Sequence, residues 1–187
     1  MSPLKFLLLY MSLALGANAA AADAYGIAEL REGDMRKLVV HDEPWEITEE
    51  PFALETGGEG RLSDYSGKIT VVNFWAVWCE PCRHEMPMLS DLQEQLGGED
   101  FEVVTIATGR NAPSAMKRFF EEIEVDNLPL HADPRMGMSR AMGVLGLPVT
   151  LVLDRNGQEI ARMVGDADWS SDSATSILSH LIASPDS

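Results

Sequence analysis

The chain alternates short apolar runs with segments in which apolar residues recur at helical spacing. An apolar run that begins at Val71 predicts a buried strand, and residues 81–95, which follow almost directly, predict a helix. A second β-rich run over 101–107 and an amphipathic stretch that starts at Pro113 repeat this order. Strand followed by helix, twice in succession, predicts an α/β fold with helices packed on a sheet.

The segments on either side of this unit predict shorter elements. Residues 149–153 and 158–164 predict two strands joined by a tight turn, and residues 173–183 predict a closing helix. Residues 25–40 predict a short helix that packs on the domain, residues 46–54 predict a strand by weak alternation, and residues 128–131 predict another short strand.

The first 19 residues have the pattern of an export signal. Lys5 precedes an apolar run over 6–15, and Ala17-Asn18-Ala19 supplies the small residues of a cleavage site. The run is shorter than the roughly 20 residues that span a bilayer, so we expect a signal peptide over 1–19 that is cleaved after about Ala19. The alternative is an uncleaved N-terminal membrane anchor. Either one places the folded part outside the cytoplasm, in the periplasm of a bacterium. We expect an N-terminal extension over 20–45 and one folded domain over 46–187.

The charge of the chain limits the kinds of partner it can have. Its 14 Lys and Arg stand against 30 Asp and Glu, which gives a formal net charge of −16. Phosphate groups are bound mainly by Lys and Arg, so this balance argues against nucleic acid and against an anionic lipid surface as partners. It favours basic partner surfaces.

The only two cysteines, Cys79 and Cys82, lie where the predicted strand meets the predicted helix. Unpaired N–H groups and the helix dipole favour an anion at a helix N-terminus, and a thiolate is such an anion. Lowering the pKa of a thiol there increases the nucleophilic form. We therefore predict that Cys79 attacks, that Cys82 resolves, and that the pair cycles between dithiol and disulfide through a mixed disulfide.

Three other interpretations of this cysteine pair are weaker. A structural disulfide across two residues closes too small a loop to restrict the unfolded chain much. A zinc site needs four ligands, and the four histidines, His41, His84, His131 and His180, are scattered. A c-type haem needs His directly after the second cysteine, where Arg83 stands. We therefore expect no metal and no cofactor.

Glu85 stands on the apolar face of the predicted helix, together with Leu89, Leu92 and Leu96. Burial raises the pKa of a carboxyl group and suits it to exchange a proton with a buried thiol, here Cys82 three residues earlier. The alternative is a partly exposed surface glutamate.

The segment around the cysteines resembles the active site of the thioredoxin superfamily on the residues Phe74-Trp75-Ala76-Val77-Trp78-Cys79-Glu80-Pro81-Cys82. Its continuation is similar to that of the TlpA/ResA-like periplasmic thiol-disulfide oxidoreductases on the residues Arg83-His84-Glu85-Met86-Pro87. The resemblance covers residues 46–181 and implies a thioredoxin fold, with a central mixed β-sheet flanked by helices. It also implies that Glu85 replaces a strand acid of thioredoxin, whose position is held here by Asn73.

The resemblance further implies a substrate site. Leu147-Pro148 matches the cis-proline loop of the family, so we expect a cis peptide bond that faces the cysteines. The backbone of Leu147 is expected to pair with an extended substrate segment. Trp78 and Pro81 are expected to shape the same site.

The activity that the resemblance implies is reduction of disulfides in protein partners, recharged by a membrane electron-donor protein. The implied partners belong to cytochrome c maturation or to copper-centre assembly in cytochrome oxidase. One alternative is an oxidant that donates its disulfide, because the dipeptide Glu80-Pro81 does not reveal a reduction potential.

Two further alternatives concern other chemistry. A copper-carrying binding module would use the cysteines together with the thioethers of Met136, Met138 and Met142. Methionines at such spacings more often fill a helix face. A peroxidase of the peroxiredoxin type is disfavoured, because those enzymes resemble one another in having Thr or Ser three residues before the reactive cysteine. Ala76 holds that position here.

Overall fold

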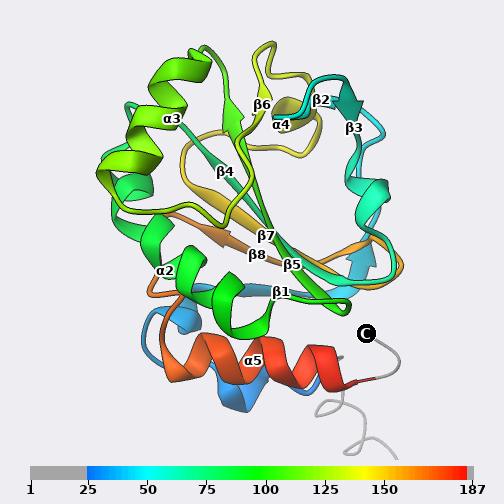
Figure 1. The fold of residues 1–187 in the computed structure, drawn as a ribbon. Helices are drawn as coiled ribbons and strands as arrows, with labels where there is room; N and C mark the ends of the chain where they lie inside the picture. Colours follow the sequence, from blue (N-terminus) through cyan, green and yellow to red (C-terminus); the bar gives the residue numbers. More distant parts are fainter. Residues whose placement is uncertain (1–24, 185–187) are drawn as a thin grey trace, which may run out of the picture.

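The computed structural model describes residues 25–184, which form an eight-stranded sheet covered by helices (Figure 1). The signal peptide or anchor predicted over residues 1–19 lies outside the described residues. The strand order is β1-β8-β7-β4-β5-β6-β2-β3. The strands are β1 (Val39–Trp45), β2 (Phe52–Ala53), β3 (Glu59–Gly60), β4 (Ile69–Trp75), β5 (Phe101–Thr108), β6 (His131–Asp133), β7 (Val149–Leu153) and β8 (Glu159–Val164).

The sheet is mixed, as expected for the predicted fold. Strand β4 lies at its centre, parallel to β5 and antiparallel to β7. All seven residues of β4 are buried, since both of its faces are covered. Burial on both faces explains why the sequence of this strand is a nearly continuous apolar run without polar alternation.

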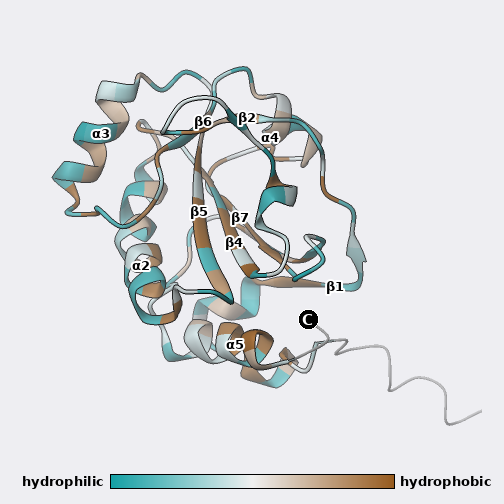
Figure 2. Cartoon of the chain, turned by 45° about the vertical axis from the view of Figure 1, so that its right-hand side comes forward, coloured by the Kyte–Doolittle hydropathy of each residue, from teal (hydrophilic) through white to brown (hydrophobic). Residues whose placement is uncertain are grey.

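Helices cover both faces of the sheet. The helices are α2 (Glu80–Leu96), α3 (Pro113–Glu122), α4 (Gly137–Ala141) and α5 (Asp172–Ala183). Val71 and Trp75 of β4 pack in a cluster with residues of α2, α3 and α5, whereas Val72 and Phe74 pack in a second cluster with α4. Neighbouring residues of a strand point to opposite faces, so these clusters are the two layers of the core. Figure 2 shows the central strands as the most hydrophobic part of the fold.

The N-terminal part differs from its predicted structure. The helix predicted over residues 25–40 is wrong, because Ala28–Leu30 and Gly33–Lys37 form two separate 3-10 turns. Gly33 adopts a φ of +50°, which is outside the helical range. Met35 and Leu38 are nevertheless buried in the first cluster, and β1 then joins β8 at the edge of the sheet.

Two other predicted strands are shorter or displaced. Only Phe52–Ala53 of the stretch 46–54 is a strand, and Pro51 just before it has no N–H to donate to a ladder. The strand predicted over 128–131 forms instead at His131–Asp133, after Pro129. No helix within residues 25–184 is long and apolar enough to cross a membrane.

His131 of β6 is hydrogen-bonded to two residues that lie far from it in the sequence. Its Nδ1 accepts a hydrogen bond from the N–H of Glu55 at 3.2 Å, and its Nε2 lies 3.2 Å from the hydroxyl of Tyr65. Burial lowers the pKa of His131, and it raises the pKa of Tyr65 to about 12. Both groups are therefore neutral at pH 7, and the neutral ring provides the acceptor that Glu55 needs.

We predict that protonation of His131 weakens the fold. Its pKa in the folded chain lies below the unfolded value, so its contribution to stability is complete above about pH 6.5 and is lost as the pH falls. Urea unfolding of the wild type and of His131→Gln, from about pH 8 to about pH 5, measures this effect. The variant should lose less unfolding free energy over that range, and equal losses would contradict the prediction.

Candidate active site

Cys79 and Cys82 form a disulfide at the N-terminus of α2. Cys79 is the N-cap residue, and its sulfur accepts a hydrogen bond from the backbone N–H of Cys82 at 3.3 Å. Cys79 retains 4% exposure and Cys82 has none. The first turn of the helix thus offers an N–H group to the sulfur of Cys79, which in the reduced protein stabilises a thiolate there. The expected division between an attacking and a buried cysteine fits this geometry.

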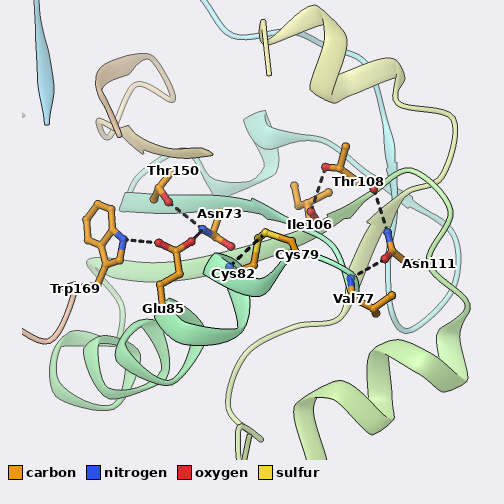
Figure 3. The surroundings of a disulfide bond; sticks show 10 residues. All are labelled: Asn73, Val77, Cys79, Cys82, Glu85, Ile106, Thr108, Asn111, Thr150 and Trp169. Carbon is orange, nitrogen blue, oxygen red and sulfur yellow. Dashed lines mark hydrogen bonds between the residues drawn. A yellow bond between two sulfur atoms is a disulfide. The ribbon is translucent and has the colours of Figure 1, made fainter. Parts of the chain in front are cut away.

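The turn before the disulfide is held by a side chain from another loop. The N–H of Val77 donates to Oδ1 of Asn111 at 2.9 Å, and Nδ2 of Asn111 donates to the carbonyl of Thr108 at 3.0 Å (Figure 3). Asn111 therefore ties the segment that leads to Cys79 to the end of β5.

Glu85 is fully buried on the face of α2 that packs against the sheet. Nδ2 of Asn73 donates to its Oε1 at 2.7 Å, and Nε1 of Trp169 donates to its Oε2 at 3.3 Å. The second Nδ2 hydrogen of Asn73 is used by Thr150, whose Oγ1 lies at 2.9 Å. Figure 3 shows Cys82 and Glu85 on the same helix, with Asn73 and Thr150 on the strands beside them. The alternative of an exposed surface glutamate is wrong.

Burial is the main cause of the altered acidity of Glu85. It raises the pKa of the carboxyl group to about 7, although hydrogen bonds from Asn73, Trp169 and the backbone of Ala167 act in the opposite direction. A carboxyl group with this pKa gives up and takes back protons near neutral pH. The interpretation of Glu85 as a proton-exchanging group thus fits its surroundings.

Two of the residues around Glu85 were not predicted as part of the site. Thr150 lies opposite Asn73 in the β4–β7 pair, and both are polar residues in buried strands, which is a signal that a sequence can give. Trp169 reaches the site from the loop before α5, 84 residues further along the chain, and nothing in its local pattern indicated this contact.

A groove of about 290 Å³ lies beside the disulfide. The Leu147–Pro148 bond is cis, as predicted, and Leu147 lines the groove together with Trp78, of which 71% is exposed. The remaining wall is formed by Thr108, Gly109, Arg110, Met136, Val144, Leu145 and Gly146. Pro81 is exposed on α2 but does not line the groove, and Pro148 is buried.

The loop on one side of this groove carries free backbone donors. Between residues 25 and 184, no hydrogen bond partner exists for the N–H groups of Leu145, Gly146 and Leu147. Leu145 is 99% exposed. Backbone N–H groups in such a position can pair with the carbonyls of an extended chain, as an added strand does at a sheet edge.

Of the three methionines considered as copper ligands, two are packed in the core. Met138 and Met142 are buried in the second core cluster, and Met142 Sδ accepts a hydrogen bond from the N–H of Thr48 at 3.3 Å. Met136 lines the groove. Within the described part of the chain, no three His, Cys, Asp or Glu residues are grouped in a way that could hold a metal ion.

We predict that Trp169→Phe raises the pKa of Glu85 above about 7. The substitution removes the N–H that stabilises the carboxylate and retains a large aromatic ring in the buried site. Carboxyl carbon NMR shifts of Glu85, followed against pH, measure the change. Trp45→Phe, at an exposed tryptophan of β1, is the matched control and should leave the Glu85 titration unchanged. A midpoint that stays in place or moves lower in Trp169→Phe would contradict the prediction.

Sequence comparisons relate this chain to known proteins. A family model described as the AhpC/TSA family matches residues 48–161. Thiol-disulfide oxidoreductase ResA of Geobacillus kaustophilus is 34% identical over 102 residues, which are 54% of this chain and 58% of ResA. Thiol:disulfide interchange protein HelX of Rhodobacter capsulatus is 30% identical over 159 residues, which are 84% of this chain and 86% of HelX.

The fold is also similar to that of a solved structure. A protein from Chlorobium tepidum described as a thiol:disulfide interchange protein of the DsbE type superposes with a TM-score of 0.66 at 26% identity. The match covers 75% of this chain and 98% of that one. The prediction of a thioredoxin fold of the TlpA/ResA-like kind is confirmed by these likenesses and by the mixed sheet.

Proposed function

The chain belongs to the AhpC/TSA family, and we propose that it is a thiol-disulfide oxidoreductase that reduces disulfides in protein partners, a proposal that its likeness to HelX supports. One observation carries the proposal: the Cys79–Cys82 disulfide at the N-terminus of α2, with the buried carboxyl group of Glu85 one turn further along the same helix. This arrangement combines a stabilised thiolate, a second thiol and a group that titrates near neutral pH.

The first step of the proposed reaction is attack by Cys79. In the reduced protein the Cys79 thiolate attacks one sulfur of a substrate disulfide, a bond forms between Cys79 and that sulfur, and the other substrate sulfur leaves as a thiolate that takes up a proton. The N-terminus of α2 stabilises the negative charge on Cys79 before the attack. No metal or nucleotide takes part in this step.

The second step releases the substrate. The carboxylate of Glu85 accepts the proton of the Cys82 thiol, and the resulting thiolate attacks Cys79 in the mixed disulfide. The Cys79–Cys82 disulfide forms, and the remaining substrate sulfur leaves and takes up a proton. The substrate has gained two electrons, which an electron-donor protein must return to the enzyme before the next cycle.

The groove beside the disulfide is the proposed substrate site. Trp78 and Leu147 offer apolar surface to the residues that flank the substrate cysteine, and the free N–H groups of the loop pair with the substrate backbone. Main-chain pairing accepts many sequences, so the reaction is proposed to act on unfolded or extended segments of protein partners. Pro148 closes the base of this loop, and Pro81 stays exposed at the entrance to α2.

The cellular setting is proposed from the sequence resemblance. Residues 1–19 would serve as a signal peptide or an inner-membrane anchor and place the domain in the periplasm. A membrane electron-donor protein would recharge the disulfide. The partners proposed are proteins of cytochrome c maturation or of copper-centre assembly in cytochrome oxidase. The likeness to ResA and HelX, whose names describe thiol-disulfide chemistry, supports the reaction proposed for this setting.

The alternatives have less support from the described structure. A copper carrier would need thioethers that are free to bind, and Met138 and Met142 are packed in the core. A peroxidase of the peroxiredoxin type would need a Thr or Ser hydroxyl three residues before Cys79, and this chain has Ala76 there. A disulfide-donating oxidant would use the same residues in the opposite direction, so only the reduction potential distinguishes it.

Catalysed reduction of insulin by dithiothreitol tests the proposed function. We expect residues 20–187 to accelerate this reaction at concentrations well below that of insulin, because each molecule turns over repeatedly. A rate equal to that of dithiothreitol alone would contradict the proposal. A protein that binds Cu(I) stoichiometrically without accelerating the reaction would support the carrier instead.

A further inference from the structure

A buried charged network lies in the fold outside the disulfide site. Nε2 of His41 lies 2.9 Å from Oε1 of Glu159, and these side chains are 3% and 1% exposed. Arg162 donates to the same carboxylate from Nε to Oε1 and from Nη2 to Oε2, both at 2.8 Å. A carboxylate this deeply buried is costly unless its oxygens are paired, and here both are. The network therefore holds Arg162 in one position.

An irregularity in β8 makes the network possible. The register of β7 with β8 passes from Val152↔Ala161 to Leu153↔Glu159, which leaves Ile160 as an extra residue. A bulge of this kind changes the alternation of side chains. Glu159 and Arg162 consequently meet on one face of β8, as their hydrogen bonds show. Bulges that re-aim a side chain are frequent next to active sites.

The arginine of this network also contacts the substrate loop. Its Nη2 donates to the carbonyl oxygen of Met142 at 2.9 Å, and Met142 is the C-cap residue of α4. Gly143, with a φ of +67°, begins the loop 143–147 that leads to Pro148. Carbonyls at a helix C-terminus have no partner within the helix, so Arg162 satisfies one of them from outside.

The edge strand β1 supports the network from the other side. The ring of Trp45 stacks on that of His41 with centroids 3.7 Å apart, and the guanidinium of Arg162 lies 5.8 Å from the Trp45 ring centroid. His41 and Trp45 belong to the segment that the sequence assigned to an extension. Residues of that segment therefore pack around Arg162, which in turn is hydrogen-bonded to the start of the loop.

We propose that Arg162 is a positioning residue that fixes the substrate loop, residues 143–147, ready to pair with a polypeptide. The inference rests on the proposed function and adds to it a residue that contacts the start of the loop through the carbonyl of Met142. A loop that is already ordered loses less conformational entropy when substrate binds, so loss of the Arg162 contact raises the KM for polypeptide substrates. Arg162 is hydrogen-bonded to Glu159 and Met142 and not to either cysteine, so the reduction potential stays the same.

The double variant Glu159→Leu/Arg162→Met removes the contact together with the carboxylate that Arg162 pairs with, so neither member of that pair leaves the other charge behind. Arg162→Lys is a second variant, which keeps a positive charge beside Glu159. An ammonium group cannot donate two parallel hydrogen bonds to that carboxylate and also reach the carbonyl of Met142 as the guanidinium does. The matched control is Lys68→Met/Glu102→Leu, which removes an ion pair of 2.7 Å at the start of β4 and β5, outside the loop. Each protein is assayed with insulin and with hydroxyethyl disulfide, a small disulfide that has no backbone to pair.

The inference predicts a KM for insulin about tenfold higher in the double variant, with the rate for hydroxyethyl disulfide and the reduction potential unchanged. Arg162→Lys should move KM in the same direction by a smaller factor, and the control should equal the wild type. Equal losses with both disulfides would show a merely structural role and overturn the inference. So would wild-type behaviour of both Arg162 variants. If the wild type itself reduces neither disulfide, the proposed function fails and the inference fails with it.

Discussion

Replacing Cys79 with serine is expected to abolish disulfide reduction, whereas replacing Cys82 with serine is expected to stop the reaction at the mixed disulfide. The first variant has no nucleophile, because a serine hydroxyl is not ionised near neutral pH. The second variant still attacks through Cys79 but has no thiol to displace the substrate. The measurement is insulin turnover, together with non-reducing electrophoresis and mass spectrometry of the variants after mixing with an oxidised partner.

The two variants control for one another, since each removes one sulfur atom from the same turn of α2. Turnover of the wild type, no adduct with Cys79→Ser and a covalent adduct with Cys82→Ser is the expected set of results. An adduct formed by Cys79→Ser but not by Cys82→Ser would exchange the two roles. It would also contradict the geometry, in which Cys79 is the N-cap residue and Cys82 has no exposed surface.

Glu85→Gln is expected to slow the release of substrate roughly a hundredfold and to remove the dependence of the rate on a group that titrates near pH 7. Burial raises the pKa of Glu85 to about 7, so the carboxylate is present in quantity only from that pH upward. The rate of the wild type should therefore rise as the pH passes through about 7. Single-turnover kinetics with insulin, measured from about pH 5 to about pH 9, separates this step from the first attack.

Glu80→Gln is the matched control for this experiment. Glu80 is exposed in the first turn of the same helix, and the same chemical change is made there. It should leave the inflection near pH 7 in place. An unchanged rate and pH profile in Glu85→Gln would show that another group accepts the proton of Cys82.

The parts of the site that lie close together in the sequence were predictable. The apolar run of β4, the cysteines and the helix α2 follow one another within one short segment, and Glu85 was recognisable because it interrupts an apolar helix face. The cis Leu147–Pro148 bond was predicted from resemblance, since base rates alone favour trans.

The parts that depend on distant contacts were not predictable. Trp169 reaches Glu85 from 84 residues away, and no periodicity encodes such a contact. The same holds for β1, which is stabilised by pairing with β8 more than a hundred residues later and carries the polar run Asp42-Glu43. The intrinsic β-propensity of a segment predicts little when a strand far along the chain supplies its hydrogen-bond partners.

The reduction potential of the Cys79–Cys82 couple tests the central claim most directly. Residues 20–187 are equilibrated with dithiothreitol or glutathione buffers, and the free thiols are trapped and counted. We predict a low potential, close to the value of about −270 mV for thioredoxin, because a protein disulfide reductase must give up its electrons readily. A potential near about −120 mV, the value of a strong oxidant, would contradict it and make the protein a disulfide donor.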